Sequence, residues 1–288
     1  MPRRVAIVTD STADLPPEIT SARGIAVVPL FVSFGDQQFR AGVDLSTAAF
    51  WERMLAPEAP FPTTAASAPG TFRDAFQAAL DAGAEAVVCI TISTKLSASF
   101  KSAELGAEML PGRDVSVVDS RLASLAEGLL VLHAADLADE GRSAAEIVAS
   151  VRARVADLDL YLALDTIEYL RKGGRLSPGR AAIATLLSIK PIITLVDGGV
   201  EVAERPRTRS KARERVLELV AGGREVERAA VLYSPGEGTD PVVFRGRLLA
   251  RLPGAVDPST IIVGALGPSI GPHVGPRSLG AVVLRRPG

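Results

Sequence analysis

Short apolar runs alternate with helical windows through the first half of this sequence, and this alternation limits the fold more than any other feature. The apolar runs are rich in Val and Ile, which favour strands, and lie at residues 5–9, 25–34, 84–92 and 115–118. The helical windows lie at residues 47–55, 70–82, 97–110 and 124–140. Strands that are apolar throughout are typical of a parallel sheet with both faces covered. The first half is therefore predicted to be an α/β domain.

The second half of the chain mixes hairpins with helices. Asp197-Gly198-Gly199 separates apolar runs at residues 191–196 and 200–204, which is a typical hairpin signal. Further strands are predicted at residues 226–233, 261–263 and 281–284, and a helix at residues 208–221. This pattern indicates a smaller α+β domain with antiparallel pairing. We expect two domains, residues 1–160 and 161–288, with an approximate boundary and a candidate crossover segment near residues 60–80.

Composition narrows the classes of function. The 288 residues include 32 basic and 33 acidic side chains, so the chain lacks the positive charge typical of a nucleic-acid-binding protein. The single cysteine, Cys89, rules out an intrachain disulfide and favours a cytoplasmic setting. Two histidines and one thiol give no zinc-type ligand set, so no metal is expected. The longest apolar segment, residues 181–196, is interrupted by Lys190-Pro191, so no transmembrane segment is predicted.

Hydroxyl groups gather where predicted strands end and helices begin. One cluster follows the run at residues 5–9, a second follows the run at residues 84–92, and a third precedes the helix near residue 70. Their members are Asp10, Ser11, Thr12 and Asp14; Ser93, Thr94, Ser97 and Ser99; and Thr63, Thr64 and Ser67. Ligands of open parallel sheets bind beyond the carboxyl ends of the strands, and helix N-termini attract anions. The three clusters together favour a polar pocket for a carboxylate or phosphate, although turn and cap chemistry explains each cluster alone.

A GxSxG pattern surrounds Ser269, the spacing of a hydrolase nucleophile. Such a serine precedes a helix, and Gly271-Pro272 with Gly275-Pro276 is predicted to prevent one. No Asp or Glu follows Ser269 to complete a triad. The pattern is therefore predicted to be accidental. His273, in the same glycine-rich loop, is a candidate hydrogen-bond donor to a carboxylate, with an ordinary surface histidine as the alternative.

Two basic segments remain. Arg171, Lys172 and Arg175 surround a glycine pair in YLRKGGRLS, which lacks the Lys-Ser/Thr of a Walker loop. These side chains either contact a partner or a phosphate group, or form a solvated loop. Arg209, in RPRTRSKAR, is within reach of an anionic head group, while most of that segment is predicted to be a solvated helix start.

These segments together resemble the DegV family of bacterial fatty-acid-binding proteins. The resemblance rests on TDSTADLP, TT..S.PG, ISTKLSASF, VVDS, YLRKGGRLS, LLSIKPIITLVDGGV and GPHVGP, in this order over nearly the whole chain. It implies a DegV-like two-domain α/β protein that encloses one long-chain fatty acid, such as palmitate, stearate or oleate, between its domains. It also implies that the protein presents the carboxylate to a separate ATP-dependent fatty acid kinase for acyl phosphate formation. No catalytic site and no cofactor of its own are expected.

The resemblance also assigns roles to residues. It places the carboxylate on Thr64, Ser93 and His273, directly or through water, with Arg209 supporting that network. The chain departs from the family after Thr64, where Ala65-Ala66 stands instead of more polar residues, and at Ser97-Ala98-Ser99-Phe100 instead of Ser-Gly-Thr-Tyr. Two alternatives remain open: a carrier of another apolar carboxylate or lipid, and a small-anion hydrolase. Peripheral membrane contact also remains open, and no nucleic-acid partner is expected.

Overall fold

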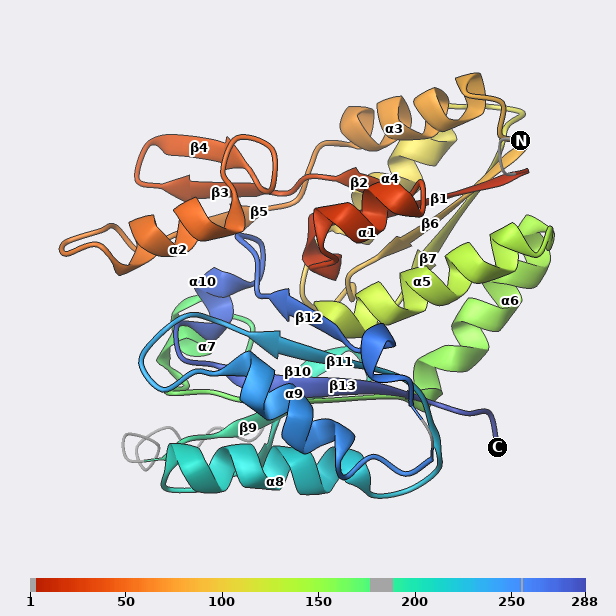
Figure 1. Ribbon diagram of the computed structural model, residues 1–288. Coiled ribbons are helices and arrows are strands. Elements are labelled where there is room, and N and C mark those ends of the chain that lie inside the picture. The colour runs from red at the N-terminus through yellow and green to blue at the C-terminus, as the bar shows by residue number, and fades with distance from the viewer. Residues whose placement is uncertain (1–3, 177–188, 255) are drawn as a thin grey trace.

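A computed structural model describes residues 4–176, 189–254 and 256–288. The first sheet is parallel, with the order β2-β1-β6-β7. Its strands are β1 (Val5–Asp10), β2 (Ala26–Val28), β6 (Ala86–Thr91) and β7 (Asp114–Asp119). Helices α3 (Pro69–Asp81) and α4 (Ser99–Glu108) cover one face, and α5 (Leu125–Asp139) and α6 (Ala144–Arg154) cover the other (Figure 1). The predicted parallel α/β sheet is confirmed, and its central strands β1 and β6 are buried on both faces.

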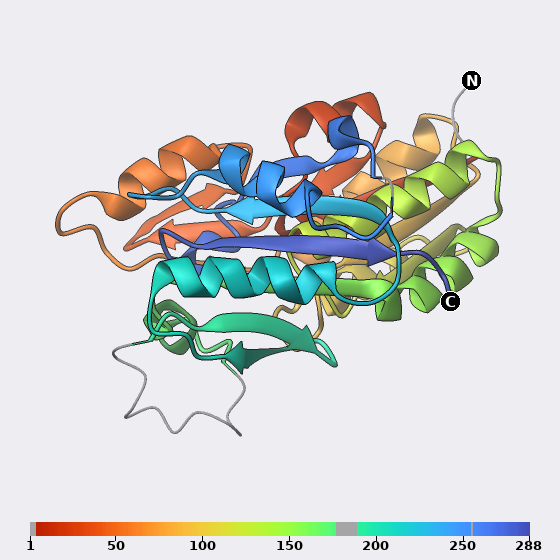
Figure 2. The same cartoon turned by 60° about the horizontal axis from the view of Figure 1, so that its bottom comes forward.

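The second sheet is mixed, with the order β10-β9-β8-β13-β11-β12. Its strands are β8 (Leu158–Ala163), β9 (Ile192–Val196), β10 (Gly199–Glu204), β11 (Val226–Tyr233), β12 (Ile262–Ala265) and β13 (Leu279–Arg285). Strands β11 and β12 pair in parallel, whereas the other neighbours pair antiparallel, and β9–β10 is the predicted hairpin. Helices α8 (Arg209–Ala221) and α9 (Pro241–Leu249) pack on the outer face (Figure 2).

A third, three-stranded sheet and the helix α2 (Thr47–Leu55) form a small layer beside the other two (Figure 1). Its strands are β3 (Phe31–Phe34), β4 (Gln37–Arg40) and β5 (Thr63–Ala65). The predicted single strand at residues 25–34 was wrong: it is split into β2 and β3 around Pro29, which has no backbone N–H for a sheet ladder. Trp51 Nε1 donates to Leu266 O at 2.8 Å, which ties α2 to the segment after β12.

Helix α5 lies between the first and second sheets and contacts strands of both. Most of its residues are buried, from Leu125 to Ala138, as expected for a helix that is apolar on all sides. One continuous hydrophobic cluster therefore includes residues of β1, β6, β8, β11 and β13. The predicted division near residue 160 falls inside β8, and residues 60–80 contain β5 and most of α3.

The remaining helical segments are short. They are α1 (Pro17–Ala22), α7 (Glu168–Lys172), α10 (Gly271–Val274) and 3-10 turns at Ser11–Ala13, Val155–Asp157 and Pro258–Thr260. Helix α10 corrects the prediction that Gly271-Pro272 prevents a helix, because proline fits the first turn of a helix. Residues 177–188, which include part of YLRKGGRLS and of the longest apolar segment, lie outside the described residues. Within the described ranges, no helix is both long and apolar enough to cross a membrane.

Candidate functional site

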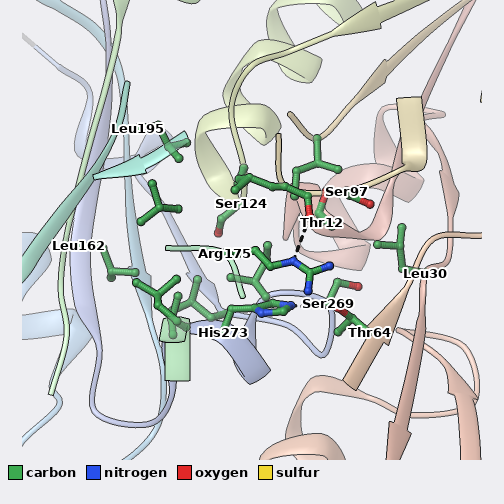
Figure 3. Close-up of a pocket in the computed structure, with 18 of the residues that line it drawn as sticks. Thr12, Leu30, Thr64, Ser97, Ser124, Leu162, Arg175, Leu195, Ser269 and His273 are labelled. Atoms are coloured by element: carbon green, nitrogen blue, oxygen red, sulfur yellow. Dashed lines mark hydrogen bonds between the residues drawn. The ribbon is translucent and has the colours of Figure 1, made fainter. Parts of the chain in front are cut away.

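A cavity of about 300 Å³ lies between the first and second sheets (Figure 3). One wall is apolar and comes from the inner face of the second sheet, with Leu160, Leu162, Ile193, Leu195, Val200 and Leu232. The facing wall is formed where β1, β6 and the start of α5 meet, with Thr12, Ile92, Ala123 and Ser124. Because β1 and β6 are parallel, their carboxyl ends meet at one edge of the sheet, as the hydroxyl clusters predicted.

Thr64 and His273 meet at one end of the cavity, although 209 positions separate them. Strand β5 carries Thr64 and helix α10 carries His273, and Thr64 Oγ1 lies 2.9 Å from His273 Nε2. Burial, with a contribution from nearby Arg175, lowers the pKa of His273 to about 4, so the imidazole is neutral at pH 7. His273 Nδ1 is buried and has no hydrogen-bond partner among the described residues. A Cβ at Gly173 would collide with this nitrogen, so Nδ1 packs against Gly173 while Nε2 is the ring nitrogen that meets Thr64.

Arg175 lies at the same end of the cavity as His273 and Thr64 (Figure 3). Its Nε donates to Leu96 O at 3.2 Å and its Nη1 donates to Gly173 O at 2.6 Å. A guanidinium has five N–H donors, so these two bonds fix its direction and leave donors for a ligand. Among the described residues that line the cavity, Arg175 is the only cation and none is acidic. The arrangement is suited to an anionic group.

Three carboxyl groups lie behind the facing wall. They belong to Asp10, Asp14 and Glu127, which together form an acid cluster. Thr12 Oγ1 is 2.8 Å from Glu127 Oε2 and also contacts Asp10 Oδ1. A hydroxyl has one hydrogen to donate, so both contacts are hydrogen bonds only when one of the two carboxyl groups is protonated. Ser124 Oγ donates to Asp14 Oδ2 at 2.6 Å. The hydroxyls of Thr12 and Ser124 are thus engaged with carboxyl groups behind the wall.

Burial raises the pKa of each carboxyl group in the acid cluster. The pKa of Asp14 rises to about 7, and that of Glu127 rises well above its usual range, with the charge of Asp10 adding to the effect. Burial also raises the pKa of Asp10, against hydrogen bonds from Thr12 and from Ile92 N. No ion pair among the described residues includes these three carboxyl groups, which agrees with at least one being protonated.

Ser93 lies outside the cavity wall, at the end of β6, with 1% of its surface exposed. Its Oγ donates to Gly198 O at 2.7 Å, at the turn of the β9–β10 hairpin. Gly198 has φ +82°, and a Cβ there would collide with Ser93 Oγ, so this contact requires glycine. Ser93 therefore joins the hairpin to the first sheet, while its neighbours Ile92 and Leu96 line the cavity.

The other predicted basic residues also lie away from the cavity. Arg209, at the start of α8, contacts Asp165 through Nε at 2.6 Å and Nη2 at 3.2 Å. Arg171 and Lys172 are exposed on α7, and Lys172 Nζ lies 5.6 Å from the centre of the Phe61 ring. The structure thus brings Thr64, His273 and Arg175 together and places Ser93, Arg209, Arg171 and Lys172 elsewhere.

Several polar residues of the site were not predicted to contact a ligand. Thr12 belonged to a predicted hydroxyl cluster, but Ser124 and Glu127 had no sequence signal beyond their place in an apolar helix. Ser269 lines the cavity, and its Oγ lies 2.8 Å from Ser11 Oγ, whereas the histidine of the same segment bonds Thr64. Within the described ranges, no group of three or more His, Cys, Asp or Glu side chains is arranged to hold a metal ion.

Fold and site together define a class: α/β proteins that enclose a mostly apolar cavity, with hydrogen-bond donors at one end, between a parallel and a mixed sheet. The sequence matches the model of the DegV family, described as uncharacterised proteins, over residues 4–286. It is 36% identical to a DegV domain-containing protein of Streptomyces coelicolor, over 99% of this chain and 100% of that one. The chain belongs to the DegV family.

Solved structures with the same fold carry a ligand description. A DegV family protein from Thermus thermophilus, described as fatty acid binding, is 36% identical with a TM-score of 0.88, over 99% of this chain and 100% of that chain. DegV from Bacillus subtilis, a fatty acid binding protein, is 29% identical with a TM-score of 0.85, over 98% and 100%. A stearic acid-binding protein from Eubacterium ventriosum is 28% identical with a TM-score of 0.84, over 98% of each chain.

Proposed function

We propose that this protein binds one long-chain fatty acid in the cavity between its two large sheets, in the cytoplasm. The observation that carries this proposal is the gradient along the cavity, from the donors Thr64, His273 and Arg175 to the apolar face of the second sheet. The solved relatives described as fatty acid binding support it. Palmitate, stearate and oleate have the combination of one carboxylate and one long apolar chain that such a cavity fits.

The apolar tail and the carboxylate of a fatty acid contribute to binding in different ways. Transfer of a methylene group from water contributes about 0.8 kcal/mol, so a sixteen-carbon chain offers up to about 12 kcal/mol. Only the surplus over the cost of association and ordering becomes affinity. The carboxylate must be hydrogen-bonded or paired when it is buried, and Arg175 with the Thr64–His273 pair supplies those partners. The tail therefore supplies affinity and the donors set the direction.

We propose that Ser93 and Arg209 support this site by holding segments beside it, although neither residue lines the cavity. Ser93 holds the β9–β10 hairpin, whose Ile193, Leu195 and Val200 form part of the apolar wall. Arg209 holds Asp165, which lies between β8 and the helix α7 that precedes Arg175. The direct contact of Ser93 with the carboxylate, implied by the family resemblance, stays a prediction that ligand titration tests.

The proposal extends to a substrate-presenting role without catalysis by this chain. A separate ATP-dependent fatty acid kinase would use the bound carboxylate to form acyl phosphate, and the exposed Arg171 and Lys172 are candidate contacts for that partner. The hydrolase alternative lacks support, because Ser269 Oγ pairs with Ser11 Oγ and not with a base. Isolated protein is expected to consume no ATP in the presence of fatty acid, and acyl phosphate is expected only after the kinase is added.

Denaturing extraction of the purified protein, followed by mass spectrometry, tests the binding function. We expect up to one fatty acid per chain. Added fatty acid at a hundred times its dissociation constant should raise the unfolding free energy of delipidated protein by about 2.7 kcal/mol. The methyl ester of the same fatty acid is the matched control, because it keeps the tail and removes the charge. Absence of lipid in the extract together with absence of stabilisation by palmitate or oleate would overturn the proposal.

A further inference from the structure

We infer that Leu195 sets the upper limit on the length of the acyl chain by separating the ligand cavity from a second cavity. The inference rests on the proposed function, since it concerns the far end of the same ligand. Leu195 lies on β9, one residue before the last position of that strand, and is half-buried.

The second cavity lies on the other side of the β9–β10 hairpin turn and has a volume of about 630 Å³. Its lining includes the apolar residues Phe100, Leu122 and Leu158 and four charged ones, Asp119, Arg121, Arg152 and Asp197. Leu195 is the one described residue that lines both this cavity and the ligand cavity. Leu195 therefore belongs to the wall that the two spaces share.

The direction of the ligand points toward this wall. Figure 3 shows Ser124 between Leu195 and Arg175, with Thr64 farther away on the same side as Arg175. A fatty acid whose carboxylate contacts Arg175 would extend its tail along the second sheet toward Leu195. The terminal methyl group of a chain that fills the cavity would then meet this side chain.

The position of Leu195 is fixed by the hairpin contact described above. Gly198 O accepts a hydrogen bond from the buried Ser93, only three residues beyond Leu195, so the strand end is tied to the first sheet. A shared wall held in this way is a barrier to longer chains. Truncation of Leu195 would join the two cavities without removing any residue that contacts the carboxylate.

The test compares delipidated wild-type protein, Leu195→Ala and Val196→Ala in competition assays with saturated fatty acids of twelve to twenty-two carbons. Val196 is the matched control, because it neighbours Leu195 and lines only the second cavity. We expect wild-type protein and Val196→Ala to reach maximal affinity at the same chain length. Leu195→Ala should prefer chains longer by two or more carbons, with a gain of up to about fourfold in affinity for each added methylene that enters the second cavity.

A double variant distinguishes two effects of Leu195→Ala, extension of the ligand cavity and a general loosening of its wall. Ala156 lies at an exposed position of the second cavity, so Leu195→Ala/Ala156→Trp should refill the space that the truncation opens. We expect this variant to lose the gain for long chains while keeping the affinity for palmitate of the single variant. An unchanged length profile in Leu195→Ala, or a gain that survives Ala156→Trp, would overturn the inference. Failure of wild-type protein to bind any fatty acid would instead overturn the proposed function.

Discussion

The two polar regions that face the cavity differ in the hydrogen-bond partners of their side chains. Thr12 and Ser124 contact the acid cluster behind the wall, and Ser124 donates its hydrogen to Asp14. Thr64, His273 and Arg175 have no acidic neighbour on the cavity wall and combine hydrogen-bond donors with one permanent positive charge. The difference teaches that hydroxyl groups on a cavity wall do not by themselves make a carboxylate site. The groups behind them decide whether their hydrogens are available to an anion.

The largest expected difference between the two regions is in the pH dependence of stability, which has opposite signs. The pKa of Asp14 is raised from 3.8 to about 7, so the folded state holds a proton that the unfolded state loses, and stability falls as pH rises through this window. The shift corresponds to about 4 kcal/mol. The pKa of His273 is lowered from 6.5 to about 4, so the unfolded state binds the extra proton and stability falls by about 3 kcal/mol as pH drops from 6.5 to 4.

Urea unfolding of delipidated protein between pH 4 and pH 7 measures both effects. Asp14→Asn should gain stability relative to wild-type protein as pH rises, and His273→Gln should gain relative stability as pH falls. Asparagine keeps an acceptor for Gly267 N, which donates to Asp14 Oδ1 at 2.9 Å. Parallel pH profiles for the two variants and wild-type protein would contradict the opposite pH dependences expected for Asp14 and His273.

Charge reversal at Arg175 should place a carboxyl group beside Thr64 and His273, as the acid cluster lies beside Thr12 and Ser124. Arg175→Glu replaces an attraction by a repulsion, and we expect a loss of about 3 kcal/mol, roughly 150-fold in affinity for palmitate. Binding of the methyl ester should change by less than about threefold, since the ester carries no charge. Arg171→Glu is the matched control, because this arginine is exposed and lies off the cavity wall. Isothermal titration calorimetry with acid and ester measures both, and equal losses for the two ligands would contradict the assignment of the carboxylate to this end.

Removal of the Thr64 hydroxyl tests the neutral part of the donor end. Thr64→Val keeps the shape of the side chain and removes the hydrogen-bonding partner of His273 Nε2. We expect a loss of about 2 kcal/mol, roughly 30-fold in affinity for the acid, with little change for the ester. The exposed Thr63 on the same strand provides the control variant Thr63→Val. Wild-type affinity of Thr64→Val for palmitate would place the carboxylate elsewhere.

The smallest effect is expected for Ser93, and it decides between two roles. As a support of the β9–β10 hairpin, Ser93→Ala should weaken acid and ester equally, by about 1 kcal/mol or roughly fivefold. A direct contact with the carboxylate would instead weaken the acid alone. Thr94→Ala controls for a change in the loop, because Thr94 Oγ1 contacts Asp119 at 2.8 Å and lies off the cavity. Titration of both ligands against both variants gives the answer.

The sequence predicted the parts of the fold that local pattern controls. Strands β1, β6 and β7 are apolar runs, and the β9–β10 hairpin surrounds Asp-Gly-Gly, so each has a local signal. Strand β4 has a weaker signal, because Gln37–Arg40 is largely exposed and polar and only the Gly35-Asp36 turn before it indicates a hairpin with β3. Helix α10 is a single turn whose proline reads as a breaker unless its position at the helix start is known.

The candidate site was less predictable because it depends on contacts between distant segments. The family resemblance pointed to Thr64 and His273, but only the packing of β5 against α10 brings them within 2.9 Å. Glu127 is a charged residue in a helix that is otherwise apolar, and its complete burial follows from the two sheets on either side of α5. Residue type alone does not show which hydroxyl faces an acid and which faces a ligand.

The order of strands in the second sheet has a consequence for how the chain folds during synthesis. Strand β13 pairs with both β8 and β11 and so lies in the middle of that sheet, yet it follows both of them in the sequence and is synthesised after them. Until then β8 and β11 lack a common neighbour, and α5 lacks its contacts with β13. The N-terminal sheet can form early, whereas the apolar wall of the cavity closes only after β13 has been synthesised. The second sheet is therefore the late-folding half of the molecule, and its contacts between distant strands make that step slow.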